Sequence, residues 1–141
     1  MKTAALLVDH VLPHRPIRQW VLSFSYPLRF VLANQPQVMG KVLGIVNCVI
    51  STYLINKVGF TVSQAHTGAM TLIQRFGSAL NLNLHFHVLF IAGVFSSKGN
   101  GQLRFHQVNA PTSKELNALV VTISERVARY LERRGRQARD G

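Results

Sequence analysis

Cysteine and acidic residues are scarce in this chain of 141 residues. The only cysteine, Cys48, excludes an internal disulfide and any zinc site built on paired cysteines. Five Asp and Glu stand against sixteen Lys and Arg, which gives a formal net charge of +11 at pH 7. An excess of that size predicts a polyanionic partner, either nucleic acid or an anionic membrane surface.

Long apolar runs are also missing. The longest apolar stretch, residues 42–55, is interrupted by small and polar residues, and at about 14 residues it is short of the roughly 20 that cross a bilayer. Residues 3–8 form too short an apolar segment for the core of a secretory signal. The sequence therefore predicts a cytoplasmic protein without a membrane partner. Hydrophobic residues make up 48% of it, which argues against disorder and suits one globular domain.

The N-terminal part of the chain predicts one strand. Two prolines exclude a continuous helix in residues 1–16, which we expect to be irregular. From Arg18 to Tyr26 apolar and polar side chains alternate, as they do in a strand with one buried face, and Pro27 ends the pattern.

A long helix follows. Asn34 is a suitable N-cap, and Pro36 is tolerated in the first helical turn. Beyond them apolar residues recur at steps of three and four, which predicts an amphipathic helix with its apolar stripe against a core. Gly59 is well placed to end that helix. Cys48 falls on the other side, so we interpret it as incidental.

The second half of the chain predicts three strands and a second helix. Residues 68–76, 82–90 and 103–108 are the strand segments, and residues 96–101 are a turn. Thr112 and Glu115 have the spacing of a capping box at the start of the helix. Its apolar stripe runs to Leu131. Residues 136–141 are expected to form a basic, frayed tail.

The order of these elements predicts an α+β fold. One strand, one helix, three strands and one helix suit a mainly antiparallel sheet with helices packed on one face or on both. We expect a single domain over residues 17–135.

The most informative strand carries two histidines. Because side chains alternate across a strand, the odd positions share one face, and His85 and His87 both lie on it. The opposite face is wholly apolar: Leu82, Leu84, Phe86, Val88 and Phe90. Two imidazoles on one face of a central strand are able to converge on one metal ion. On spacing alone, the alternative is that both are solvated or hydrogen-bonded histidines.

The sequence resembles a known family at this point. His85-Phe86-His87 matches the His-hydrophobic-His signature of the HUH nucleases. Over residues 9–135 the chain is similar to the transposases of rolling-circle insertion sequences, the two-tyrosine HUH group. The similarity rests on four stretches: Arg18–Phe24, Gln64–Gly68, Leu72–Ser78 and Asn81–His87.

This resemblance implies an HUH-type palm domain that nicks and joins DNA. His85 and His87 would hold a divalent cation, Mg²⁺ or Mn²⁺, over a phosphodiester of single-stranded or hairpin DNA at insertion-sequence ends. A tyrosine would attack and leave a 5′-phosphotyrosine and a free 3′-hydroxyl. By matching, Gln74 is the third ligand. Its strand parity with Met70 and Leu72 predicts the apolar side, so a bulge near Gly77 would have to turn it outward; the alternative is a buried, hydrogen-bonded amide.

The nucleophile departs from the family pattern. The family's tyrosines are expected on a helix beyond residue 141, and its cysteine-rich zinc module has no counterpart here. Of Tyr26, Tyr53 and Tyr130, only Tyr130 follows the histidines on a helix, and its phase favours core packing. The sequence thus indicates a transposase palm from a truncated copy. The alternative is a catalytically inactive DNA-binding remnant.

Arginines are the expected DNA contacts. Each could meet a phosphate or be a solvated surface charge, and together they predict salt-sensitive DNA binding and association with the nucleoid. The candidates are Arg18, Arg29, Arg75, Arg104, Arg126 and Arg129.

Overall fold

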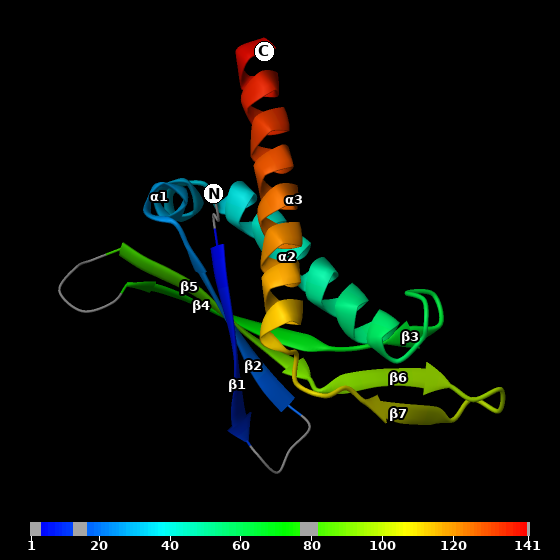
Figure 1. The fold of residues 1–141 in the computed structure, drawn as a ribbon. Helices are drawn as coiled ribbons and strands as arrows, with labels where there is room; N and C mark the ends of the chain where they lie inside the picture. Colours follow the sequence, from blue (N-terminus) through cyan, green and yellow to red (C-terminus); the bar gives the residue numbers. More distant parts are fainter. Residues whose placement is uncertain (1–3, 13–16, 77–81, 141) are drawn as a thin grey trace.

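The computed structural model describes residues 4–12, 17–76 and 82–140. It is an α+β fold with antiparallel sheets and helices packed against them, as the sequence predicted (Figure 1). The elements in chain order are β1 (Ala4–Leu12), β2 (Ile17–Phe24), α1 (Tyr26–Asn34), α2 (Pro36–Lys57), β3 (Ala65–His66), β4 (Ala69–Phe76), β5 (Leu82–Ile91), β6 (Gly93–Ser97), β7 (Leu103–Gln107) and α3 (Ser113–Asp140).

Two antiparallel sheets form the frame. The larger has the strand order β1-β2-β5-β4, so the strand with the two histidines is an interior strand with a neighbour on each side. The smaller sheet, β3-β6-β7, is a hairpin with a two-residue strand added. In the larger sheet His85 pairs with Ser23 of β2 and with Gln74 of β4, while His87 pairs with Val21 and Leu72.

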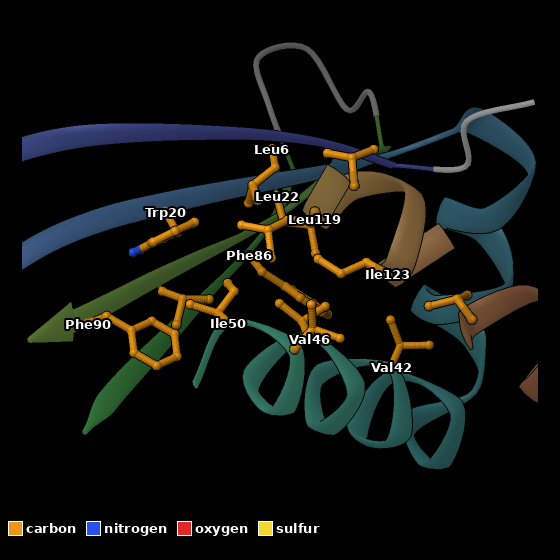
Figure 2. Packing of buried hydrophobic residues seen from close by; sticks show 14 of the residues in the cluster. Leu6, Trp20, Leu22, Val42, Val46, Ile50, Phe86, Phe90, Leu119 and Ile123 are labelled. Carbon is orange, nitrogen blue, oxygen red and sulfur yellow. The ribbon is translucent and has the colours of Figure 1, made fainter. Parts of the chain in front are cut away.

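The core lies between the larger sheet and helices α2 and α3. Alternate residues of β2 and β5 point into it, and Trp20, Leu22 and Phe86 are almost completely buried. Figure 2 shows Val42, Val46 and Ile50 of α2 beneath this face, with Leu119 and Ile123 of α3 beside them. Burying each such side chain stabilises the fold by about 1.5–3 kcal/mol, so the alternation in β5 fixes which face the helices cover.

The helix ends are formed as the sequence predicted, except that the N-cap of α2 is Gln35, without a side-chain cap hydrogen bond, whereas Asn34 is the last residue of α1. Pro36 lies in the first turn of α2, and Gly59, with φ of +84°, follows its last turn. At the start of α3 the Thr112 amide donates to Glu115 Oε1 and the Glu115 amide donates to Thr112 Oγ1, which is a capping box. Glu115 also forms an ion pair with Lys57 at the end of α2.

Three other local predictions are wrong. Residues 4–12, expected to be irregular, form β1, because the prolines at 13 and 16 lie after the strand and do not interrupt it. Pro27 does not merely end a strand; it lies in the first turn of α1, where a missing amide hydrogen does no harm. Residues 136–140 continue α3 and are not a frayed tail.

Helix α2 would cross a membrane by length and composition alone. Its apolar stripe instead faces the sheet, as in the core helix of a globular domain, so this helix is weak support for a membrane span. Within the described residues, the helices cover one face of the larger sheet, and no helix covers the face that bears His85 and His87 (Figure 1).

Candidate functional site

The uncovered face of the larger sheet carries the two histidines side by side. The centroids of the His85 and His87 rings are 6.3 Å apart, with the ring planes inclined at 68°. Both side chains are partly exposed, whereas Leu84, Phe86 and Val88 between and beside them point into the core. The alternation expected from the sequence therefore places both imidazoles on the open face.

Arg29 of α1 adds a positive charge next to His85. Its Nε donates to the carbonyl oxygen of Phe24 at 2.8 Å, which fixes the guanidinium near the end of β2 where Ser23 pairs with His85. Burial lowers the pKa of His85, and the charges of Arg29 and His87 lower it further. The neutral imidazole, which is the form that binds metals, is thereby favoured.

One ring nitrogen of His85 is buried without a partner. Its Nδ1 forms no hydrogen bond with the side chains and backbone that the structure describes. A buried polar atom without a partner is costly and is characteristic of functional sites. Over the described residues, however, no group of three His, Cys, Asp or Glu side chains could hold a metal ion, so a third protein ligand would have to be of another type.

The register places the Gln74 position on the same face as the histidines. Gln74 pairs with His85, and Leu72 pairs with His87. Met70 and Leu72 are 63% and 57% exposed. These two residues, which share the strand parity of Gln74, therefore lie on the open face of the sheet. Met70 and Leu72 thus show that this parity does not lead into the core, and the register of β4 with β5 shifts between Gln74 and Phe76. The side chain of Gln74 lies outside the described part of the chain.

The open face has a polar end and an apolar end. The polar end consists of the row nearest α1, which holds Ser23, His85 and the Gln74 position, together with His87 in the next row and Arg29 beside them. Further along the strands the rows consist mainly of apolar residues: Val21, Leu72, Leu89, Met70, Ile17 and Ile91. A polar ligand would be held at the first end only.

Two exposed aromatic residues lie beside Arg29 on α1. Tyr26 and Phe30 are 63% and 44% exposed, and their rings pack edge to face with centroids 4.9 Å apart. The sequence pattern did not lead to this pair, because Tyr26 was assigned to the preceding strand. The signal was the spacing of four residues between these two aromatic side chains, with a proline directly after the first of them.

The six candidate arginines are scattered over the molecule. Arg29 adjoins the histidines, whereas Arg18 points into the core with 5% exposure and leaves Nε and Nη1 without hydrogen-bond partners. Burial lowers the pKa of Arg18, and the charge of the Tyr53 hydroxyl opposes this effect. Arg104 is exposed on β7 of the smaller sheet. The side chain of Arg75 lies outside the described residues.

Arg126, Arg129 and Tyr130 all lie on α3, in the layer on the other side of the sheet from the histidines. Tyr130 is partly buried and packs against the core, in agreement with its helical phase. Tyr53 is enclosed between β2 and the start of α3; burial and the neighbouring charge of Glu115 raise its pKa to about 12. Of the three tyrosines, only Tyr26 lies at the end of the sheet where His85 is found.

These features define an α+β fold with an antiparallel sheet that is open on one face and carries a histidine pair on an interior strand. A family model with the description "Putative transposase" matches residues 68–141, and the chain belongs to that transposase family. The match begins just before β4 and includes both histidines and all of α3. It agrees with the cytoplasmic location expected from the sequence. Searches of curated proteins and of solved structures gave no match.

Proposed function

We propose that this transposase domain is of the rolling-circle HUH type and nicks and rejoins single-stranded DNA at insertion-sequence ends with the help of a divalent metal. The observation that carries this proposal is the histidine pair. His85 and His87 lie on one exposed face of an interior strand, and Nδ1 of His85 has no hydrogen-bond partner among the described residues. Arg29 supplies the positive charge that an incoming phosphate requires.

The residues at the polar end fit a divalent cation. His85 and His87 would hold Mg²⁺ or Mn²⁺, with Gln74 as the candidate third ligand and further positions left to water or phosphate oxygens. Such an ion, when bound, supplies Lewis-acid polarisation of the scissile phosphodiester. A tyrosine hydroxyl then attacks phosphorus, loses its proton and becomes the 5′-phosphotyrosine, while the departing oxygen becomes a free 3′-hydroxyl.

The aromatic pair on α1 supports a single-stranded substrate. Proteins that bind single strands combine basic side chains with exposed aromatic rings on which bases stack. Tyr26 and Phe30 provide two such rings, and Arg29 lies between them in the sequence. A base stacked here would place its phosphate toward the end of β5 that carries His85.

The double variant His85→Ala/His87→Ala tests this proposal. We expect it to lose Mn²⁺ binding in calorimetry and to lose metal-dependent cleavage of an end-labelled, hairpin-bearing single strand by at least about 100-fold. His66→Ala is the matched control, because His66 is exposed on β3 of the smaller sheet. Unchanged Mn²⁺ affinity in the double variant would contradict the assignment of the site.

A second candidate function is DNA binding without cleavage, which would still associate the protein with the nucleoid. It is favoured by the absence of a third His, Cys, Asp or Glu ligand among the described side chains. A denaturing gel separates the two functions. A covalent protein–DNA adduct that depends on Mn²⁺ supports nicking, whereas binding with no adduct under any divalent metal supports the binding function.

A further inference from the structure

A basic groove runs between α2 and α3, in the helical layer of the molecule. Its main part has a volume of about 330 Å³ and is lined by five cationic side chains and one acidic one, Glu132. An adjoining part of about 240 Å³ adds Arg134. The cations of this groove are Lys41, Arg126, Arg129, Arg133, Arg134 and Arg136.

The groove holds more positive charge than its own structure requires. Of the ion pairs among the described side chains, the one found joins Lys57 to Glu115, at the opposite end of α2. Arg126 makes a long contact with Cys48 Sγ, and Arg134 Nη2 donates to Gln35 Oε1 at 3.4 Å. These contacts leave the guanidinium charges without a carboxylate, so an external anion would neutralise them.

The charges form a straight line of defined length. Arg126, Arg129, Arg133 and Arg136 recur at steps of three and four on one side of α3 and span about 15 Å along its axis. Each strand of duplex DNA has one phosphate per about 3.4 Å of the duplex axis, so the span of this row corresponds to about four base pairs of axial rise. Figure 1 shows that the C-terminal half of α3 projects beyond the sheet, where a rigid rod could lie along it.

The side chains of the groove favour duplex DNA over other polyanions. Binding of single strands uses aromatic platforms, but the one aromatic residue here, Tyr130, packs against the core. Membrane binding uses large apolar side chains opposite the charges, and Val121 is the one large apolar residue exposed on the described part of α3. Backbone contacts alone suffice for binding without sequence preference.

We infer that the groove between α2 and α3 is a docking surface for the phosphate backbone of duplex DNA. This surface is separate from the histidine site, because the sheet lies between them. It goes beyond the proposed nicking activity and does not depend on it. The histidine face processes a single strand, and the groove holds the neighbouring duplex, such as a hairpin stem.

The test uses the full chain and a fluorescent, blunt-ended duplex of 16 base pairs at several salt concentrations. We expect Arg129→Gln/Arg133→Gln to lower duplex affinity by on the order of tenfold at low salt and to reduce the salt slope by about two, one for each phosphate that is no longer neutralised. The matched control is Lys98→Gln/Lys114→Gln, which removes the same charge from exposed sites outside the groove. It should leave the slope within about 0.5 of the wild-type value.

Three outcomes would overturn the inference. The first is an equal loss of duplex affinity in the control and in the groove variant. The second is a preference of the wild type for single strands that persists in the groove variant. The third is binding to vesicles of anionic lipid that the duplex does not displace. The failure of the histidine proposal is distinguishable. His85→Ala/His87→Ala should keep duplex affinity, and the groove variant should keep Mn²⁺ affinity.

Discussion

The two sides of the larger sheet differ in the side chains that they present, and the proposed functions differ with them. On the open side lie two imidazoles, one arginine and a pair of exposed aromatic rings, with apolar residues beyond them. On the helical side lie six cations in one groove and none of the histidines of β5. Thus the net charge of +11 is not concentrated at the reactive groups. In our proposals, affinity for a polyanion and chemistry on a phosphate are therefore assigned to different surfaces.

The largest effect is expected from a variant that destabilises the sheet shared by both surfaces. Phe86 is fully buried on the reverse of β5, between His85 and His87. Phe86→Ala should lower the free energy of unfolding by about 3–5 kcal/mol. Denaturant titration measures this, and Mn²⁺ and duplex binding should fall in parallel. A stable variant that loses one activity and keeps the other would contradict a shared frame.

Removing the aromatic pair should affect the open side only. Tyr26→Ala/Phe30→Ala should weaken binding of a single strand by about 1–3 kcal/mol for each base that stacks, with duplex affinity unchanged. Fluorescence anisotropy with both oligonucleotides measures the difference. Tyr26→Phe is the control, because it keeps the ring. If it keeps binding but abolishes the covalent adduct, Tyr26 is the nucleophile; equal losses for both oligonucleotides would refute the division of surfaces.

Removing the carboxylate of Glu115 at the start of α3 should change the stability of the fold in a pH-dependent way. The ion pair with Lys57 and the amide of Thr112 hold the pKa of Glu115 at about 2, well below its ordinary value of 4.5. The lowered pKa stabilises the fold above pH 4.5, and this contribution is lost as the pH falls toward 2. Glu115→Gln should therefore unfold more easily at pH 7 and show a shallower loss between pH 4.5 and 2. Thermal melts over that range check the sign; parallel pH profiles would contradict it.

The smallest effect is expected at Tyr130. Its ring packs against the core, and the sheet separates it from the histidines. Tyr130→Phe keeps the ring and should change the free energy of unfolding by less than about 0.5 kcal/mol. Any covalent adduct with DNA should form as in the wild type. Loss of the adduct in this variant would place the nucleophile on the helical side and contradict the assignment of the chemistry to the open side.

Local patterns predicted much of this fold. The alternation around His85, the apolar stripe of α2 and the pair Thr112 and Glu115 each specify a structure that depends on near neighbours in sequence. Strand β1 was missed because it is recognisable only through its pairing with β2. The parity of Gln74 could not assign its side, because Met70 and Leu72 are apolar but exposed on an edge strand. Apolar identity does not fix the face when nothing covers it.

The two surfaces were predictable to different degrees. The histidine pair could be read from one strand, because two positions of equal parity share a face. The groove could not, since Lys41 and Arg133 are far apart in the sequence and meet only after α2 and α3 pack together. The placement of Arg29 next to His85 likewise depends on the turn between β2 and α1.

Cross-linking from one defined position on each surface tests the separation of the two sites most directly. Cys48, the only cysteine, is exposed and its Sγ lies 3.9 Å from Arg126 Nη1 at the groove, so it accepts a photoreactive maleimide there. In the variant Cys48→Ser/Leu72→Cys the same label is on the open face, opposite His87. We expect label at position 48 to cross-link duplex DNA and label at position 72 to cross-link a single strand. Identical cross-linking of both DNAs from both positions would contradict the account.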